Sequence, residues 1–479
     1  MTTQTTSYRA ALDAFLSASS AYRATAAIDE LRATDYARLD RADWVYLDYT
    51  GAGLYAESQI RRHEELLLGG VFGNPHSKSP TSLTSATHVE AARRAVREFF
   101  RASPEEYEVI FTAGASAALK LVGESYPFAP GGRYLLTYDN HNSVNGIREY
   151  ARAGGAKVMY LPVDASELRM DPDMVRQELA KPLSGSDNLF GYPAQSNFSG
   201  VQHPLEWIDE AHEHGWDVVL DAAAFTPTNR LDLSVIKPDF VPLSFYKMFG
   251  YPTGMGALVV RRTALSKLVR PWFAGGTITL ASVQGEGWHH LAPGATGFED
   301  GTADFLGMPA VEIGIAHLSR AGIDVIHQRV SALAGWLLEQ MNTMVHTNGA
   351  PMVRIFGPQN MKARGATIAF YLLDPLGKVY DVHKMEALAG EQRISLRTGC
   401  FCNPGDGEVA HRITAADMAA CFTEPAAVTF QECQDLIGTA TGKMPNTIRV
   451  SLGLASNFAD VYKFVEFAEG FKDRAADAI

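Results

Sequence analysis

The chain has 479 residues, and its 42 Lys and Arg against 54 Asp and Glu give a formal net charge of −12 at pH 7. This acidic balance argues against a nucleic-acid-binding protein, which needs a basic face for the phosphate backbone. An apolar share of 46% and a charged share of 20% are ordinary for a folded globular chain of several domains.

The sequence shows no sign of membrane insertion or export. No stretch approaches the roughly 18 consecutive apolar residues of a membrane-spanning helix. The start of the chain lacks a basic segment followed by an apolar one, so we expect no signal peptide. Four Cys do not make a disulfide framework. We therefore expect a cytoplasmic protein, in which a special Cys would be reactive or metal-bound.

Short apolar strands alternate with helices along the first two thirds of the chain. The first 40 residues read as two short amphipathic helices, and a longer helix is predicted at 88–101. The predicted strands lie at 44–48, 109–112, 134–138, 158–161, 217–221, 239–241 and 256–260. Helices between short apolar strands indicate a mostly parallel sheet that is covered on both faces and binds ligands at the carboxyl ends of its strands.

The pattern changes after about residue 310. A long helical stretch at 327–341 precedes strands at 367–372 and 448–452, which we interpret as a second, smaller α+β domain. The predicted organisation is an N-terminal helical segment packed on the small domain (1–45), a large domain (46–310) and a small C-terminal domain (311–479).

The segment GAGLYA at 51–56 matches the dinucleotide-binding fingerprint G-x-G-x-x-A after a strand. That fingerprint also requires an acidic residue about 20 positions further on. The corresponding region, GGVF at 69–72, has none. We therefore do not expect a nicotinamide site here.

The segment TAGASAA at 112–118 joins a predicted strand to a helix. Small residues at such a junction let backbone N–H groups close around a phosphate, with the helix dipole behind them. The Lys of a nucleotide-triphosphate loop is missing, so a single phosphate group fits better. The alternative is that these residues only allow the helix to pack closely on the sheet.

Two charged residues stand at the ends of predicted strands. Lys247 lies within SFYKMFG at 244–250, and loss of solvation among apolar neighbours lowers the pKa of such an amine and favours a Schiff base. Asp221 closes the strand 217–221, where a carboxylate can keep a pyridinium nitrogen protonated. The structural alternatives are a snorkelling Lys at a strand end and an Asp that caps a helix.

The segment RTGCFCNPG at 397–405 joins an Arg to two Cys on a loop rich in Gly and Pro. Arg397 offers a fork for a substrate carboxylate, and the loop favours exposed, reactive thiols. The alternative is a metal site formed by Cys400, Cys402, Cys421 and Cys433. A C-x-C pair followed by gaps of 18 and 11 residues does not match the usual zinc spacing, so we expect no metal.

His141 follows the predicted strand 134–138 and can stack on an aromatic cofactor or act as acid or base, although most loop His do neither. The order along the chain is then a phosphate loop, a His, an Asp, a Lys, and an Arg with two Cys. Pyridoxal phosphate is one ligand that uses all of these groups.

The chain resembles the fold-type I pyridoxal-phosphate enzymes of the class V aminotransferase and cysteine desulfurase group. Within this group it is most similar to the N-terminal desulfurase domain of molybdenum cofactor sulfurases. The resemblance runs from about residue 46 to 470, and its most specific stretches are SFYKMFGYPTG and RTGCFCN. Other matching stretches are YLDYTGAGLY, GNPHS, DNHNSVNGIREYA, YPAQSNFSG, LDAAAFTPTNRLDLS, FEDGTADFLGMPA and IRVSLG. It implies an α/β fold with a mostly parallel large domain, a smaller α+β C-terminal domain and a homodimer.

The resemblance also implies roles for single residues. Lys247 would bind the cofactor covalently and move protons, His141 would stack over its ring and Asp221 would pair with its nitrogen. Further contacts to the cofactor would come from Ala115, Ser116, Asn197, Ala223 and Ser244 of the same subunit. Thr277 would reach the cofactor phosphate from the partner subunit. Arg397 would bind the substrate carboxylate. Cys402, with Cys400 as the second candidate, would take up the sulfur.

These roles predict a cysteine desulfurase that converts L-cysteine to alanine and leaves a persulfide on Cys402 for transfer to an acceptor protein or cofactor. The chain departs from its relatives at Ala224, where bacterial desulfurases often have Gln, and after CFCN, where PGDG replaces the usual x-GAC. Another pyridoxal-phosphate reaction, by a carbon–sulfur lyase, epimerase or aminotransferase, would keep Lys247 and Asp221 but would not need Cys402. A non-enzymatic binding protein is the third alternative.

Overall fold

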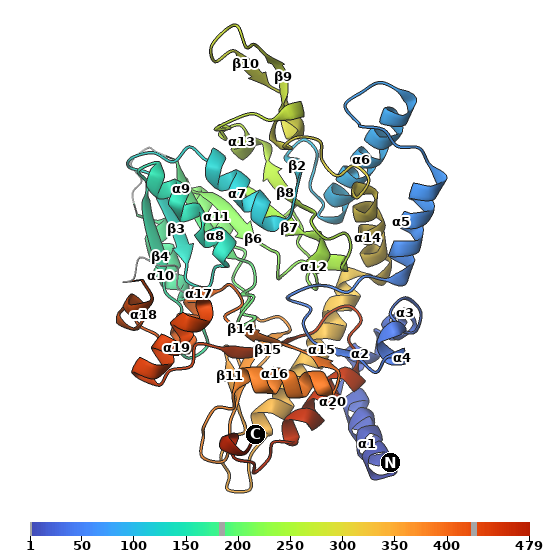
Figure 1. The fold of residues 1–479 in the computed structure, drawn as a ribbon, viewed down its shortest axis with the longest axis vertical. Coiled ribbons are helices and arrows are strands. Elements are labelled where there is room, and N and C mark those ends of the chain that lie inside the picture. Colours follow the sequence, from blue (N-terminus) through green and yellow to red (C-terminus); the bar gives the residue numbers. More distant parts are fainter. Residues whose placement is uncertain (1, 182–186, 423–428) are drawn as a thin grey trace.

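Figure 1 shows the computed structural model, which describes residues 2–181, 187–422 and 429–479. A seven-stranded sheet of order β2-β8-β7-β6-β5-β3-β4 forms the centre of the larger part. Its strands are β2 (Tyr107–Thr112), β3 (Arg133–Thr137), β4 (Lys157–Leu161), β5 (Asn188–Pro193), β6 (Asp217–Asp221), β7 (Phe240–Ser244) and β8 (Gly256–Arg261). Strand β8 runs antiparallel to β2 and β7, and the other neighbouring pairs are parallel. The mostly parallel sheet is confirmed.

Strands β6 and β7 are buried on both faces, which explains why they read as short continuous apolar runs. Successive side chains point to opposite faces of a strand. Val218 and Leu220 therefore join the larger apolar core, whereas Val219 between them joins a second, smaller core.

Strand β5 was not predicted from the sequence. Its residues NLFGYP include Asn, Gly and Pro, which are typical of turns. In the structure, Gly191 lies so close to Tyr134 of β3 that a Cβ would stand 3.1 Å from the phenol oxygen. The Asn188 side chain accepts a hydrogen bond from the Arg133 N–H. Tertiary contacts in the middle of the sheet thus outweigh the local turn preference.

Helices cover both faces of this sheet (Figure 1). Helix α7 (Ala115–Ser125) packs on β7, β8 and α9 (Ile147–Ala153), and α6 (Pro80–Phe99) packs on α14 (Met308–Ala321). Helix α6 begins at Pro80, ahead of the predicted start at residue 88. The other helices of this part are α5 (Glu57–Gly69), α8 (Asn142–Asn145), α10 (Pro172–Leu179), α11 (Trp207–Glu213), α12 (Phe245–Phe249) and α13 (Arg262–Leu265).

The smaller part is built on an antiparallel sheet of order β11-β12-β15-β14. Its strands are β11 (Val353–Phe356), β12 (Thr367–Leu372), β14 (Arg397–Gly399) and β15 (Thr447–Ser451). Its helices are α15 (Ile323–Thr343), α16 (Val382–Glu391), α17 (Pro404–Ala410), α18 (Ala415–Phe422), α19 (Phe430–Thr441) and α20 (Phe458–Glu469). The short strand β1 (Val45–Tyr46) pairs with β13 (Ile394–Ser395).

The N-terminal segment forms four helices rather than the two predicted. They are α1 (Thr2–Ala18), α2 (Ser20–Arg23), α3 (Ala27–Asp35) and α4 (Arg38–Arg41). The Ser19 side chain lies between α1 and α2 and caps α2 by accepting a hydrogen bond from the Tyr22 N–H. Phe15 stacks on Phe458 of α20 at 4.8 Å, and Arg32 Nη2 donates to Asp460 Oδ1 at 3.0 Å. These contacts place the segment against the smaller part.

A hairpin of β9 (Ile278–Ala281) and β10 (His289–Leu291) projects at the top of Figure 1. It follows the short 3-10 turn η1 (Gly275–Thr277), and a second such turn, η2 (Gly294–Phe298), comes after it. Among the helices of the described ranges, none has both the length and the apolar character that crossing a bilayer requires.

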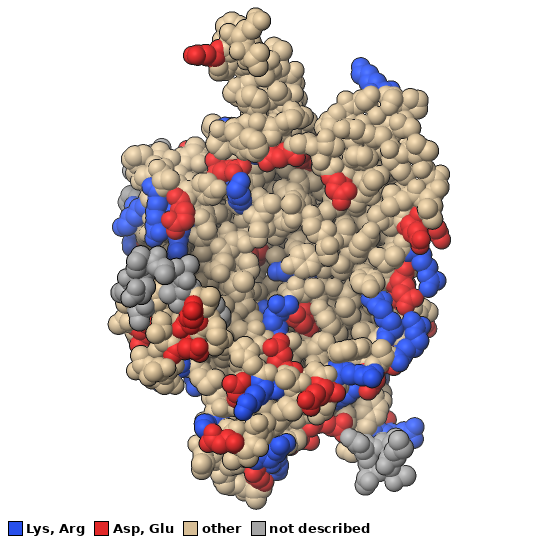
Figure 2. Space-filling model, in the orientation of Figure 1, with Lys and Arg blue, Asp and Glu red and all other residues tan. Residues whose placement is uncertain are grey.

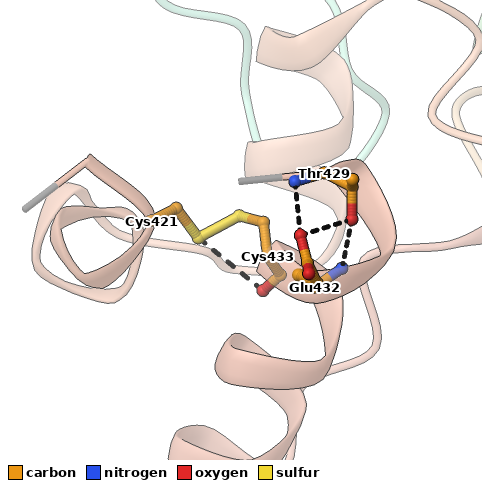
Figure 3. Close-up of a disulfide and its surroundings, with 4 residues drawn as sticks. All are labelled: Cys421, Thr429, Glu432 and Cys433. Atoms are coloured by element: carbon orange, nitrogen blue, oxygen red, sulfur yellow. Dashed lines mark hydrogen bonds between the residues drawn. A yellow bond between two sulfur atoms is a disulfide. The ribbon is translucent and has the colours of Figure 1, made fainter. Parts of the chain in front are cut away.

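Cys421 of α18 and Cys433 of α19 form a disulfide (Figure 3). The first turn of α19 is capped by Thr429 and Glu432. No disulfide framework was expected from four Cys, and this one disulfide was not predicted from the sequence, because two helices bring together residues that the spacing did not relate. Cys400 and Cys402 are free. Within the described ranges, no group of three His, Cys, Asp or Glu is placed to hold a metal ion.

Candidate active site

A cavity of about 200 Å³ lies at the carboxyl ends of the large sheet. It brings together most of the site residues predicted from the sequence. Those that line it are Ala115, Ser116, His141, Asn197, Asp221, Ala223, Ser244 and Lys247. They follow or end five strands of the sheet, namely β2, β3, β5, β6 and β7. This is the edge at which sheets of this kind bind ligands.

Lys247 lies in the middle of α12, a helix fixed by close backbone packing. Gly250 ends the helix in the left-handed region, at φ 79°. The Gly53 N–H donates to the Tyr246 carbonyl at 3.0 Å, and a Cβ at Gly53 would stand 2.7 Å from the Lys247 carbonyl oxygen. The Gly-rich segment 51–56 is thus a turn that supports the lysine helix.

The electrostatic surroundings of Lys247 favour a reactive amine. Burial lowers the pKa of Lys247, and the nearby Asp221 carboxylate opposes that shift only in part. Burial also lowers the pKa of His141, whose Nδ1 accepts a hydrogen bond from the Ser143 N–H at 3.1 Å. An amine with a lowered pKa can attack a carbonyl carbon or accept a proton.

The loop between β2 and α7 has the form of an anion cradle. Gly114 adopts φ 136°, and a Cβ at Gly256 of β8 would stand 2.7 Å from its Cα. Helix α7 begins directly afterwards, so the N–H groups of its first turn have no partner within the helix. The hydroxyl groups of Ser116 and Ser143 lie 2.6 Å apart at the same end of the cavity.

Two arginines converge on Asp48 beside the cavity. Arg397 Nη2 lies 2.7 Å from Asp48 Oδ2, and Arg449 Nη2 lies 3.0 Å from Asp48 Oδ1. The Arg397 side chain is 49% exposed, whereas that of Arg449 is 3% exposed. Burial lowers the pKa of Arg449 to about 10, against the opposing effect of Asp48. The positive charges of both guanidinium groups also lower the pKa of Lys247.

Arg449 was not among the site residues predicted from the sequence. It lies on β15, which pairs with β14, and the register sets Arg449 opposite Arg397. The matching stretch IRVSLG contains it, but the sequence did not show that the strand returns to the site. Asp48, which follows β1 and orients both arginines, was missed for the same reason.

Cys402 lies on a tight turn that is fastened to the cavity wall. Phe401 and Cys402 both adopt left-handed backbone angles, at φ 57° and 55°. The Asn142 N–H donates to the Cys402 carbonyl at 2.8 Å, and Asn197 Nδ2 donates to the Phe401 carbonyl at 2.7 Å. Cys402 is exposed, whereas Cys400 is half-buried and burial raises the pKa of its thiol. Cys402 is therefore the more accessible nucleophile.

Thr277 does not line this cavity within one subunit. It ends η1 near the projecting hairpin, and its hydroxyl accepts a hydrogen bond from the Ala274 N–H at 2.9 Å. A contact with a cofactor phosphate would require a second subunit, so this role stays a prediction.

The family model for class V aminotransferases matches residues 45–464. The chain belongs to this family. It is 36% identical over 471 residues to the molybdenum cofactor sulfurase of Solanum lycopersicum, covering 92% of this chain and 57% of that protein. It is 36% identical over 459 residues to the human molybdenum cofactor sulfurase, covering 91% of this chain and 50% of that protein. The chain thus spans about half the length of the curated relatives it matches.

Among solved structures, a cysteine desulfurase from Thermococcus onnurineus in its apo form matches with a TM-score of 0.74 and 22% identity. The match covers 92% of this chain and 97% of that one. At this identity the likeness establishes the fold, which is the one expected of a fold-type I enzyme with a large and a small part.

Proposed function

We propose that this chain is a pyridoxal-phosphate-dependent cysteine desulfurase. The observation that carries the proposal is an exposed thiol, Cys402, on a turn held by Asn197, which lines the same cavity as the buried amine of Lys247. Membership in the class V aminotransferase family and the likeness to molybdenum cofactor sulfurases support it.

The residues around the cavity fit pyridoxal phosphate. Lys247 supplies an amine for the aldehyde group, and Asp221 supplies a carboxylate for the pyridine nitrogen at the end of β6. The loop before α7, with Ala115 and Ser116, offers N–H and hydroxyl donors for one phosphate group. His141 borders the space between these groups and would cover the ring face. When bound there, the cofactor withdraws electrons from the substrate Cα.

The chain's own residues then bind and orient an amino acid. Arg449 and Arg397 present guanidinium groups to the substrate carboxylate, and Asp48 holds both in place. Lys247 Nζ, whose pKa is lowered by burial, accepts the proton from the substrate Cα and returns it to the carbon chain of the product.

Cys402 performs the sulfur step. Its thiolate forms a bond to the substrate sulfur while the Cβ–S bond of the substrate breaks. The electron pair of that bond stays on the carbon fragment, which becomes alanine after protonation. Cys402 keeps the sulfur as a persulfide, which is then passed to an acceptor.

We further propose a homodimer. A cytoplasmic location stays a prediction, and the Cys421–Cys433 disulfide counts against the Cys argument from which it came. Exposed apolar side chains at and beside the projecting hairpin support a dimer, and Figure 2 shows few charged groups on this projection. They are Trp272, Phe273, Leu280, Val283 and Trp288. Sedimentation tests the dimer, and cell fractionation tests the location.

The function is tested by adding L-cysteine to the purified holoenzyme and measuring alanine and sulfane sulfur. The wild type should release both in equal amounts. Cys402→Ala should abolish this, whereas Cys400→Ala, a matched substitution two residues away, should retain most of it. Pyruvate and ammonia in place of alanine, with turnover unaffected by Cys402→Ala, would instead indicate a carbon–sulfur lyase.

A further inference from the structure

A buried carboxyl group lies directly behind the turn that carries Cys402. Asp406 is in the first turn of α17 and is 0% exposed. The helix approaches the segment after β3 so closely that a Cβ at Gly405 would overlap the Tyr138 carbonyl. The desulfurase steps above do not use this carboxyl group.

A second buried carboxyl group belongs to the same cluster. Asp139, also 0% exposed, follows β3 and lines the cofactor cavity. Asn403 Nδ2 bridges the two residues, at 2.9 Å from the Asp139 carbonyl and 3.3 Å from Asp406 Oδ2. Burial raises the pKa of Asp406 well above its usual value, and the nearby Asp139 raises it further.

The hydrogen bonds leave one oxygen of each carboxyl group without a partner. Asp406 Oδ2 accepts from Ser196 Oγ at 2.6 Å, and Asp139 Oδ2 contacts His203 Nε2 at 2.6 Å. The Oδ1 atoms of Asp406 and Asp139 are both buried and unpartnered within the described residues. Asp139 has His203 beside it, but a second buried carboxylate at Asp406 is costly because it has no cation of its own. Protonation removes that charge and gives the carboxyl group an O–H donor.

We propose that Asp406 is protonated at neutral pH and donates a hydrogen bond from Oδ1 to the Oδ1 of Asp139, which locks the Cys402 turn onto the cavity wall. The lock acts through Asn403, whose amide also lies 3.1 Å from Asn197 Oδ1. Asp406 is thus a positioning residue for Cys402. Loss of its proton at alkaline pH sets two negative charges against each other and loosens the turn.

The groups packed around Asp406 agree with this role. The charged or titratable ones are Asp139 from the loop after β3 and, through it, His203 from the loop after β5. The others that face it are neutral: Ser196, Ser199 and Asn403. The structure shows no cation in direct contact with Asp406 among the described residues, so a proton is the available source of compensation.

The first test needs no turnover. Urea unfolding of the holoenzyme and of Asp406→Asn is compared from about pH 5 to pH 8. The folded wild type holds a proton that its unfolded chain has lost, so its unfolding constant should rise about tenfold per pH unit relative to the variant. A constant ratio between the two proteins would overturn the proposal. If Asp406→Asn does not fold, Asp406→Ala is measured in the same series.

Asp164→Asn is the matched control for this series. The Asp164 carboxylate accepts hydrogen bonds from Ser166 and from backbone N–H groups, and these lower its pKa. This carboxylate is ionised in both the folded and the unfolded chain above pH 5. The ratio of the unfolding constant of the wild type to that of Asp164→Asn should therefore not change with pH.

The second test rests on the proposed function and measures persulfide formation on Cys402 against pH. In the wild type this rate should fall at alkaline pH, and Asp406→Asn, whose amide donates at every pH, should remove the fall. Asp406→Ala should slow the step about tenfold or more, with the absorbance change on adding L-cysteine intact. Parallel profiles for wild type and Asp406→Asn would contradict the positioning role. Absence of persulfide in the wild type would refute the desulfurase proposal and leave the unfolding test standing.

Discussion

Removal of the Asp48 side chain should weaken both the fold and substrate binding. Asp48 is 8% exposed and accepts hydrogen bonds from Arg397 Nε and Nη2 and from Arg449 Nη2. In Asp48→Ala, Arg449 would remain buried as a cation without its carboxylate partner. Arg397 would lose the group that orients it but would keep its contact with water.

The two arginines contribute unequally to the expected loss. An uncompensated charge at a buried pair costs about 3–5 kcal/mol, and this applies to Arg449. The half-exposed Arg397 adds at most about 1 kcal/mol, because water screens it. The free energy of unfolding should therefore fall by about 3–6 kcal/mol, a large share of the roughly 5–15 kcal/mol of a typical domain.

Urea unfolding at neutral pH measures this loss, and steady-state kinetics with L-cysteine should show a KM raised about tenfold or more. Asp40→Asn is the control, because the Asp40 side chain is 55% exposed and its partner Arg32 keeps Asp460. It should cost less than about 1 kcal/mol. A loss below about 1 kcal/mol for Asp48→Ala, with KM unchanged, would refute this account of the arginine pair.

Three further predictions concern packing, thiols and pH. Gly53→Ala places a Cβ 2.7 Å from the Lys247 carbonyl oxygen. It should lower the free energy of unfolding in urea by about 1–3 kcal/mol and reduce the absorbance of the bound cofactor. In the control Gly69→Ala, the added Cβ meets no atom within 4 Å, so neither quantity should change. Thiol titration without reductant should find two free thiol groups, of which Cys402 reacts first. After reduction under denaturing conditions it should find four. Four free thiols without reductant would contradict the disulfide. Burial lowers the pKa of His411 to about 4, so the unfolded chain binds its proton first. Relative to His411→Gln, the wild type should lose about 1.4 kcal/mol per pH unit as the pH falls from about 6.5 towards 4, and equal slopes would contradict this.

Local pattern was sufficient to predict every strand of the large sheet except β5, and several of the residues at its carboxyl edge. The apolar runs at β6, β7 and β8 marked strands, and the groups that follow such strands, Asp221 and Lys247, meet at one cavity. This succeeds because parallel topology alone brings strand ends together.

The missed features depend on contacts between distant parts of the chain. Arg449 reaches the site only because β15 pairs with β14. Strand β5 forms because it pairs with its neighbours in the sheet, although Gly191 and Pro193 have little preference for strands. The Cys421–Cys433 disulfide depends on how α18 and α19 pack. The burial of Asp406 was likewise invisible, because a carboxyl in a polar loop sequence reads as exposed.

The central claim is that Cys402 takes sulfur from L-cysteine at the Lys247 cavity. Mass spectrometry of the holoenzyme after a single addition of L-cysteine, without reductant, tests it most directly. The account predicts a peptide containing Cys402 that is heavier by one sulfur atom, in step with the alanine formed, and no such gain in Lys247→Ala. Alanine or pyruvate formed with Cys402 unmodified, or sulfur found on Cys400 instead, would contradict it.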